Sequence, residues 1–522
     1  MTVPGFPTEQ ALSRTHRDNF YKVNHIIYML FRYSFCPDIG AWQHVDENRT
    51  CLIEEMQVWD GLSDARIQFL GSEVIRQSHT PLAMGQHAPE MARLTENLNL
   101  QRALLRQLQS QDVRVTLLDK TRVARIVPEQ PLGSSSSPWP VVETNTNRCL
   151  RARLLVGADG PSSPVRAFSK IETFGWNYDA RAIVATLQHS PAGITSLGLP
   201  RPCTTAYQRF LPTGPLAFLP LAPGRASLVW STTPELAEAL LGAGPDILSV
   251  MINAAFRLPD ISITYLHKLL LERWAGVRAG KEGETQITAG EFVDAVQWRE
   301  SSHSIEPFSA LSSFEDCQGG VPSADIELFP PLIQSIQPNS AASFPLRMSH
   351  AAEYVGPRTA LLGDAAHTVH PLAGQGLNLG LADAESLARC IMDAIKYGAD
   401  VGSRTSLADY ARKRYFANHM MISATDKLQK LYGTRLGPVV WARSVGLEVV
   451  NEWTGLKGGL MRVAGGSAES GGSHGGDGGL AWVAAASGVE AISAVIDAGR
   501  TVAGVVGNLI SGKDGGRVAR GH

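Results

Sequence analysis

The stretch "ALLGDAAHTVHPLAGQGLNLGLADAESLA" spans residues 360–388 and combines the patterns of a buried strand, a polar turn and a helix. Residues 358–364 predict a strand that ends at Asp364, and residues 376–395 repeat apolar side chains at helical spacing. The expected apolar face of that helix comprises Leu377, Leu381, Ala384, Leu387, Ile391 and Ile395. A strand that leads through a turn into an amphipathic helix is typical of α/β folds.

The turn contains Pro371, Gly374 and Gly376. Glycines directly before a helix let the backbone approach a ligand closely, and the first-turn N–H groups favour negative charge. Such a site suits an electron-rich ring whose reduced form is anionic. Asp364, at the end of its strand, can accept hydrogen bonds from sugar-like hydroxyls. The stretch therefore predicts a flavin site, with the carboxylate on the ribityl chain and the helix start at the pyrimidine edge of the ring.

Two other interpretations of this stretch remain open. Gly-Asp-Ala-Ala-His alone is a common loop. His367 and His370 are three residues apart and suggest a metal site, but no Glu or third ligand stands at metal spacing. The complete string at fixed spacing, between a strand and a helix, favours the flavin.

A second string, "RARLLVGADGPSSPVR" at residues 151–166, predicts another strand and turn. Asp159 and Gly160 lie at the tip of the turn, and Arg166 follows shortly after. Asp-Gly is also a general signal for a tight turn, so a surface turn is the alternative. Two such strings, roughly two hundred residues apart with a β-rich block between them, favour one shared site.

Composition excludes several classes of protein. The chain has 522 residues, 44% of them hydrophobic and 18% charged, with a net charge of −2, as in a soluble globular protein of two or more domains. It lacks the basic excess of a nucleic-acid binder. Its six cysteines are scattered without a C-x-x-C pair, which argues against a zinc site or disulfide framework and favours a reducing compartment. No apolar segment reaches the ~20 residues of a membrane-spanning helix, and the N-terminus shows neither a secretory nor a transit pattern.

Between the two strings, residues 167–345 contain strand-like runs divided by Gly/Pro turns. The clearest runs are 181–188, 216–221 and 226–232. This pattern predicts a largely antiparallel sheet.

The strings "LLVGADGPSSPVR" and "GDAAHTVHPLAGQGLNLG" resemble the flavin-dependent aromatic hydroxylases related to p-hydroxybenzoate hydroxylase. Further motifs resemble the ubiquinone-biosynthesis branch in its eukaryotic mitochondrial form: "MQVWD" (56–60), "QRFLPTGPLAFLPL" (208–221), "SLVWST" (227–232) and "HAAEYVGPRTALLGDAAHTVHPLAGQG" (350–376). The resemblance runs from about Ile39 to about Lys457, with breaks at 273–300 and in parts of 310–335. It implies an α/β, p-hydroxybenzoate-hydroxylase-like FAD-binding fold with an α+β substrate domain built on an antiparallel sheet.

The largest departure from this family is at the N-terminus. Family members open with a strand, a G-x-G-x-x-G turn and a helix, and this chain has no such motif, so its Rossmann-type part is incomplete. Either the gene model lost its first exons or the chain is a degenerate copy; the intact downstream motifs favour the first. We expect the chain as written to be poorly soluble or to purify without stoichiometric FAD, and not to hydroxylate. We also expect an upstream reading frame to encode the strand, G-x-G-x-x-G turn and helix, and its joining at about Ile39 to restore FAD binding.

The resemblance and composition divide the chain into six expected segments. These are 1–37, unassigned and a candidate gene-model artefact; 38–166, part of the FAD-binding domain; 167–345, the substrate domain with an insertion at about 273–300; 346–460, the remaining FAD-binding domain with C-terminal helices; 461–479, a Gly/Ser linker; and 480–512, an apolar helix. We expect that helix to lie on a membrane or to pack on the body, because its charges and glycines argue against spanning, and a disordered tail is the alternative.

The resemblance also implies roles for single residues. Asp364 would hold the ribityl chain of FAD, and Asp159 and Gly160 would lie near the pyrophosphate. The loop and helix start against the isoalloxazine ring would comprise Pro371, Gly374, Gln375, Gly376 and Asn378. Asn97 would contact the flavin from another helix start, although an ordinary exposed helix N-terminus fits that position equally well. The candidate substrate walls are Phe210, Phe218 and Trp230, with sheet core as the alternative for each.

The implied reaction is hydroxylation of a polyprenylated phenol in ubiquinone biosynthesis, at C5, with O₂ and a flavin C4a-hydroperoxide; no general base is identified. The implied partners are a ferredoxin-type electron donor and other ubiquinone-biosynthesis proteins, and the implied location is the matrix side of the mitochondrial inner membrane, as a peripheral protein. Two alternatives are an NAD(P)H-dependent hydroxylase of another aromatic substrate and a non-catalytic scaffold subunit.

Overall fold

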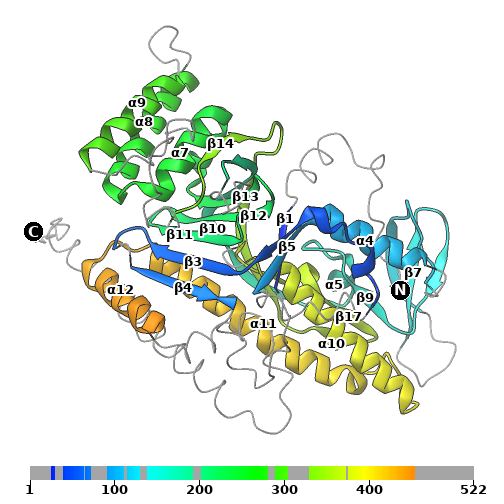
Figure 1. Ribbon diagram of the computed structural model, residues 1–522. Coiled ribbons are helices and arrows are strands. Elements are labelled where there is room, and N and C mark those ends of the chain that lie inside the picture. The colour runs from blue at the N-terminus through cyan, green and yellow to red at the C-terminus, as the bar shows by residue number, and fades with distance from the viewer. Residues whose placement is uncertain are drawn as a thin grey trace, which may run out of the picture.

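The computed structural model describes ten segments of the chain: residues 25–29, 39–63, 65–71, 91–110, 115–129, 138–191, 202–279, 288–303, 329–371 and 374–452. Figure 1 shows a large sheet with helices on both sides and a second α/β region beside it. The predicted linker and terminal helix, residues 461–479 and 480–512, lie outside the described residues.

The large sheet has nine strands, in the order β18-β15-β10-β13-β12-β11-β3-β4, with β14 also paired to β10. Their bounds are β3 Glu55–Asp60, β4 Arg66–Leu70, β10 Thr173–His189, β11 Thr205–Leu211, β12 Gly214–Ala222, β13 Arg225–Thr232, β14 Ile333–Ile336, β15 Ala342–Ala351 and β18 His367–Thr368. Every described pairing is antiparallel except β11 with β3. The predicted antiparallel sheet is therefore confirmed, and strands from both flanking segments join it.

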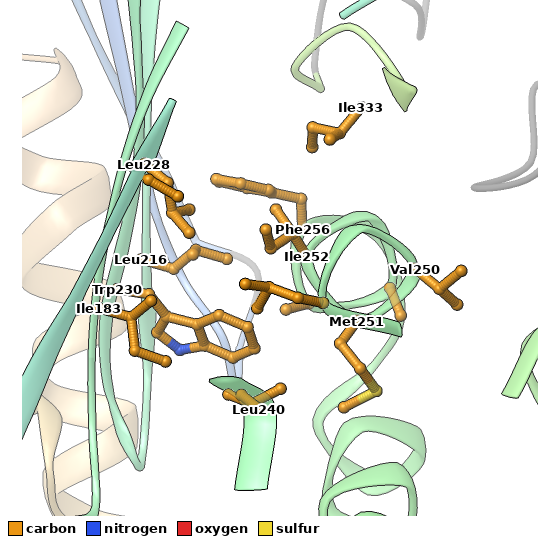
Figure 2. Close-up of a cluster of buried hydrophobic side chains, with 14 of the residues drawn as sticks. Ile183, Leu216, Leu228, Trp230, Leu240, Val250, Met251, Ile252, Phe256 and Ile333 are labelled. Carbon is orange, nitrogen blue, oxygen red and sulfur yellow. The ribbon is translucent and has the colours of Figure 1, made fainter. Parts of the chain in front are cut away.

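One face of this sheet packs against helices and forms the main core. The helices are α6 Pro234–Gly242, α7 Pro245–Arg257, α8 Asp260–Arg278 and α9 Ala289–Ser302. Trp230 lies in register with Ile183 and Leu216 on the neighbouring strands and faces Ile252 and Phe256 of α7 (Figure 2). Burying side chains of this size stabilises the fold by about 1.5–3 kcal/mol each.

The second α/β region holds the two strings. Its elements are β6 Val123–Pro128, β7 Pro140–Thr144, β8 Cys149–Arg151, β9 Leu155–Gly157, α5 Pro164–Phe168, β16 Val355–Gly356, β17 Thr359–Leu361, α10 Gly376–Lys396 and α11 Arg404–Tyr432. Helix α12 Gly437–Glu452 packs instead against β4 of the large sheet (Figure 1). Strand β9 runs parallel to β17, with Leu155 opposite Thr359 and Gly157 opposite Leu361. The order β16-β17-β9 leaves β9 at the end of this sheet within the described part of the chain.

Strands β6, β7 and β8 form a separate antiparallel sheet. A fourth sheet has three strands in the order β1-β5-β2 and is antiparallel. Its strands are β1 His25–Met29, β2 Thr50–Ile53 and β5 Ala92–Glu96, and β5 leads directly into α4 Asn97–Gln109. A strand from the unassigned N-terminal segment thus pairs with the body. Within the described residues, every helix is too short or too polar to span a bilayer.

Candidate functional site

The structure brings the two strings together at one edge of the smaller sheet. Asp159 follows β9 and Asp364 follows β17, and these strands are parallel neighbours, so both carboxylates lie at the carboxyl ends of their strands. Arg166 of α5 joins the strings directly, because its Nη1 donates to the carbonyl of Ala365 at 2.7 Å. This edge is where ligands bind in open α/β sheets.

Asp364 belongs to a short 3₁₀ turn, η6, which spans Gly363–Ala365. Its side chain is exposed to solvent. Desolvation by the surrounding residues raises the pKa of the Asp364 carboxyl group, while His367 and Arg347 act in the opposite direction. An accessible carboxylate at this position can accept hydrogen bonds from ligand hydroxyls.

Asp159 uses one of its two carboxylate oxygens within the protein. Its Oδ2 accepts a hydrogen bond from the backbone N–H of Val165, in the first turn of α5, at 3.2 Å. Its Oδ1 is buried and has no hydrogen-bond partner among the described residues. A Cβ added at the next residue, Gly160, would meet no atom within 4 Å. The turn therefore offers a polar group and an open backbone surface to a ligand.

The start of α10 offers similar features. Gln375 directly precedes the helix and is buried, and its Nε2 has no hydrogen-bond partner among the described residues. Asn378 donates to Oε1 of Gln375 at 3.3 Å. A Cβ added at Gly376 would meet only Val369, at 3.9 Å. A buried amide and an open helix start fit a ring with polar edge atoms and partial negative charge.

The predicted apolar face of α10 was partly wrong. The buried residues of this helix are Asn378, Leu379, Ala382, Asp383, Leu387 and Ala394, whereas Ile395 is 65% exposed. Leu377 and Leu381 instead pack beside Leu100 of α4. The buried face includes Asp383 because its charge is compensated by partners that lie far away in the sequence.

Asp383 is fully buried and accepts four hydrogen bonds. Its Oδ2 accepts from the backbone N–H of Gly363 at 3.0 Å and lies 2.6 Å from Nε2 of His367. Its Oδ1 accepts from Nε of Arg414 at 2.8 Å and from Nδ2 of Asn418 at 3.0 Å. Sequence reasoning did not identify Asp383, Arg414 or Asn418 as site residues.

The two histidines of the turn point to different partners. His367 contacts Asp383, whereas the His370 ring packs edge-on against Tyr178 of β10 at a centroid distance of 5.1 Å. Tyr178 in turn donates to Oδ1 of Asp426 of α11 at 2.9 Å. Burial lowers the pKa of His370 to about 4, although Asp426 opposes this shift. A neutral His370 thus lies between the polar turn and the large sheet, directly before Pro371.

The remaining predicted residues have separate locations. Asn97 begins α4, which packs against α10 through Leu100. Phe218 and Trp230 lie in the core between the large sheet and α6–α8, and Phe210 stacks on Tyr432 with ring centroids 4.0 Å apart. Phe218 and Trp230 therefore belong to the sheet core, and the substrate-wall interpretation was wrong for these two residues. Phe210 lies in a separate buried cluster with Tyr432 and Val439, and its role as a substrate wall stays a prediction.

Comparison with known proteins identifies relatives along most of the chain. A family model described as a FAD binding domain matches residues 328–423. The mitochondrial ubiquinone biosynthesis monooxygenase COQ6 of Saccharomyces cerevisiae is 34% identical over 377 residues, which cover 72% of this chain and 72% of the yeast protein. The Homo sapiens protein of the same name is 33% identical over 428 residues, covering 81% of this chain and 78% of its own length.

Solved structures show the same fold at lower identity. PqsL, a probable FAD-dependent monooxygenase from Pseudomonas aeruginosa, superimposes with a TM-score of 0.52 at 19% identity and covers 81% of this chain and 89% of its own. The p-nitrophenol 4-monooxygenase PnpA from Pseudomonas putida gives a TM-score of 0.52 at 15% identity, with 88% of each chain covered. The predicted p-hydroxybenzoate-hydroxylase-like fold is confirmed.

Proposed function

The chain belongs to the family of FAD-dependent ubiquinone biosynthesis monooxygenases, and on this premise we propose that it hydroxylates the ring of a polyprenylated phenol at C5 with O₂. The observation that carries this proposal is the convergence of Asp159 and Asp364 at adjacent strand ends, beside the open start of α10. The unpartnered Oδ1 of Asp159 and Nε2 of Gln375 fit the polar atoms of a bound FAD.

In the proposed site, each predicted residue has a distinct task. Asp364 accepts hydrogen bonds from the ribityl hydroxyls, and Asp159 with Gly160 orients the pyrophosphate region. The loop and helix start hold the polar edge of the ring through Pro371, Gly374, Gln375, Gly376 and Asn378, and Asn97 adds a contact from α4. FAD, when bound, supplies the activation of O₂ and the transfer of one oxygen atom to the substrate ring.

The chain itself excludes water from one side of the proposed site. His370 and Tyr178 form an aromatic contact next to Pro371, and the Asp426 carboxylate fixes the Tyr178 hydroxyl. A neutral imidazole and an oriented phenol close this side of the site without adding a net charge. Excluding water protects reactive species from side reactions and strengthens the polar contacts inside the site.

We further propose a ferredoxin-type electron donor, association with other ubiquinone-biosynthesis proteins and a peripheral position on the matrix side of the mitochondrial inner membrane. The yeast and human relatives are named as mitochondrial proteins, which supports the compartment. The apolar segment 480–512 supports the membrane contact by its composition.

The test supplies FAD, O₂ and a polyprenylated phenol to the chain joined at about Ile39 to a G-x-G-x-x-G unit, with the chain as written in parallel, using either ferredoxin with its reductase or NADPH as reductant. Mass spectrometry should find a product 16 Da heavier, with the new hydroxyl at C5 by NMR, in the ferredoxin reaction, at about one oxygen atom per turnover. Turnover of another phenol with NADPH alone would support the alternative hydroxylase. A folded chain that neither binds FAD nor hydroxylates would support the scaffold.

A further inference from the structure

The turn that carries Asp364 is tied at two points to one buried carboxylate. Asp383 accepts the N–H of Gly363, one residue before Asp364, and contacts His367, three residues after it. Gly363 has a φ of +59°, a conformation that residues with a side chain rarely adopt. The carboxylate therefore anchors the start and the end of the turn, in addition to the Arg166 hydrogen bond to Ala365 and the pairing of β18 with β15.

A second set of contacts anchors this carboxylate to α11. Arg414 donates Nε to Oδ1 of Asp383 at 2.8 Å and Nη2 to Oδ1 of Asn418 at 2.8 Å. Asn418 also donates to Asp383 and to the Tyr354 hydroxyl, both at 3.0 Å. All of these side chains are buried. Asp383 thus links the position of the turn to the long helix α11.

We propose that Asp383 is a positioning residue for FAD. Asp383 holds the turn Gly363–Thr368 so that the Asp364 carboxylate faces the ribityl chain. This inference rests on the proposed flavin-binding role of Asp364. Asp383 itself is enclosed by protein and points to donors on two sides, so it acts on the cofactor only through the turn.

The charge on Asp383 is part of this role. Burial disfavours its ionised form, but His367 and Arg414 outweigh burial, so the pKa of Asp383 lies below its usual value. An ionised carboxylate accepts on both oxygens. Asparagine has the same size but one amide nitrogen, which would face donors either from Gly363 and His367 or from Arg414 and Asn418. Asp383→Asn therefore breaks one of the two sets of contacts without removing volume.

A second buried ion pair offers a matched control. Asp60 at the end of β3 is also fully buried and is bound by Nε and Nη2 of Arg443, at 2.8 and 2.9 Å. Its other contacts are to Leu62 and Ser63, within its own turn. Asp60→Asn makes the same chemical change in a pair that does not contact the turn Gly363–Thr368.

The experiment compares the full-length chain with Asp383→Asn and Asp60→Asn. FAD affinity is measured by fluorescence titration, and hydrogen–deuterium exchange is measured on peptides covering residues 361–369. Asp383→Asn should raise the Kd for FAD tenfold or more and speed exchange in these peptides. Asp60→Asn should change the Kd for FAD and the exchange rate by less than twofold, even if it lowers the melting temperature as much as Asp383→Asn does. Equal effects of the two variants, or none from Asp383→Asn, would overturn the positioning role.

Two further arms keep the outcomes distinct. Arg414→Lys keeps a cation beside the carboxylate, so if Asp383→Asn does not fold, this variant must show the same two changes at a smaller size, about threefold, or the proposal fails. The FAD titration is run on the chain as written and on the chain joined at about Ile39 to a G-x-G-x-x-G unit, and if neither wild-type form binds FAD, the flavin-binding role of Asp364 fails. The exchange measurement then still shows whether Asp383 holds the turn, and unchanged exchange would reject that as well.

Discussion

Two buried aspartate–arginine pairs occupy similar environments but serve different parts of the molecule. Asp383 pairs with Arg414 between α10 and α11, and Asp60 pairs with Arg443 between β3 and α12. In both pairs the carboxylate is fully buried and the arginine is at most 3% exposed. Burial and pairing alone therefore do not distinguish a cofactor region from a purely structural one.

The difference lies in what else each pair holds. Arg443 also donates to the carbonyls of Leu431, Tyr432 and Thr434, and so secures the end of α11 and the connection to α12. Asp383 instead holds the turn beside Asp364. The remaining hydrogen bonds of a buried pair, rather than the pair itself, indicate which part of the molecule depends on it.

The largest expected effect is a loss of stability when either buried arginine is removed, and it should be similar for the two pairs. Arg414→Met and Arg443→Met each leave a buried carboxylate without its cation, so each should lower the free energy of unfolding by about 3–5 kcal/mol. Urea denaturation measures this directly. A loss below about 1 kcal/mol in either variant would show that water or a rearranged donor replaces the arginine there, and the two regions would no longer be comparable.

The sequence predicted the strands, the turns and the start of α10, because glycines, strand alternation and helical spacing are local signals. It did not predict the Asp383–Arg414 pair, whose members are 31 residues apart. A charged residue in an amphipathic helix normally indicates the solvent side, so the expected apolar face excluded Asp383. Nor did alternation show which face of β12 and β13 meets helices, so Phe218 and Trp230 were candidate substrate walls.

The stability of the protein should depend on pH through His370, which directly precedes Pro371 in the predicted flavin loop. The pKa of His370 falls from 6.5 to about 4 on burial, so its contribution to stability is complete above pH 6.5 and is lost as pH falls toward 4. That loss is about 3 kcal/mol at 1.36 kcal/mol per unit. His370→Phe should remove this part of the pH dependence in urea denaturation between pH 7 and 4. If the unfolding free energies of the variant and the wild type fall in parallel with pH, His370 is not the source of this pH dependence.

Asp364→Ala tests the turn itself and should leave both ion pairs intact. In a chain joined at about Ile39 to a G-x-G-x-x-G unit, we expect FAD affinity to fall by roughly 1.5–3 kcal/mol, the scale of a hydrogen bond to a charged acceptor. Because Asp364 is exposed, the unfolding free energy without FAD should change by less than about 0.5 kcal/mol. Fluorescence titration and urea denaturation of the same preparation separate the two quantities. Unchanged FAD affinity in a folded variant would remove Asp364 from the site.

The smallest expected effect tests whether the flavin site includes Asn97 of α4. Asn97 begins α4, and α4 packs on α10 through Leu100, Leu377 and Leu381, so Asn97 is positioned to reach a ligand that lies at the start of α10. One neutral hydrogen bond contributes about 0.5–1.5 kcal/mol, so Asn97→Ala should weaken FAD binding about two- to tenfold.

The ordinary alternative for Asn97 gives a different pattern. If Asn97 serves only the N-terminus of α4, Asn97→Ala should lower the unfolding free energy slightly and leave the Kd for FAD unchanged. Asn99, two residues later, is the matched control, because its side chain donates to the carbonyl of Asp46 at 2.9 Å and accepts from the Asp46 N–H at 3.0 Å. Asn99→Ala should therefore lower stability by about 1–3 kcal/mol through buried groups left unpaired. A flavin region that includes α4 requires the opposite ranking in affinity, with Asn97→Ala the weaker binder of FAD.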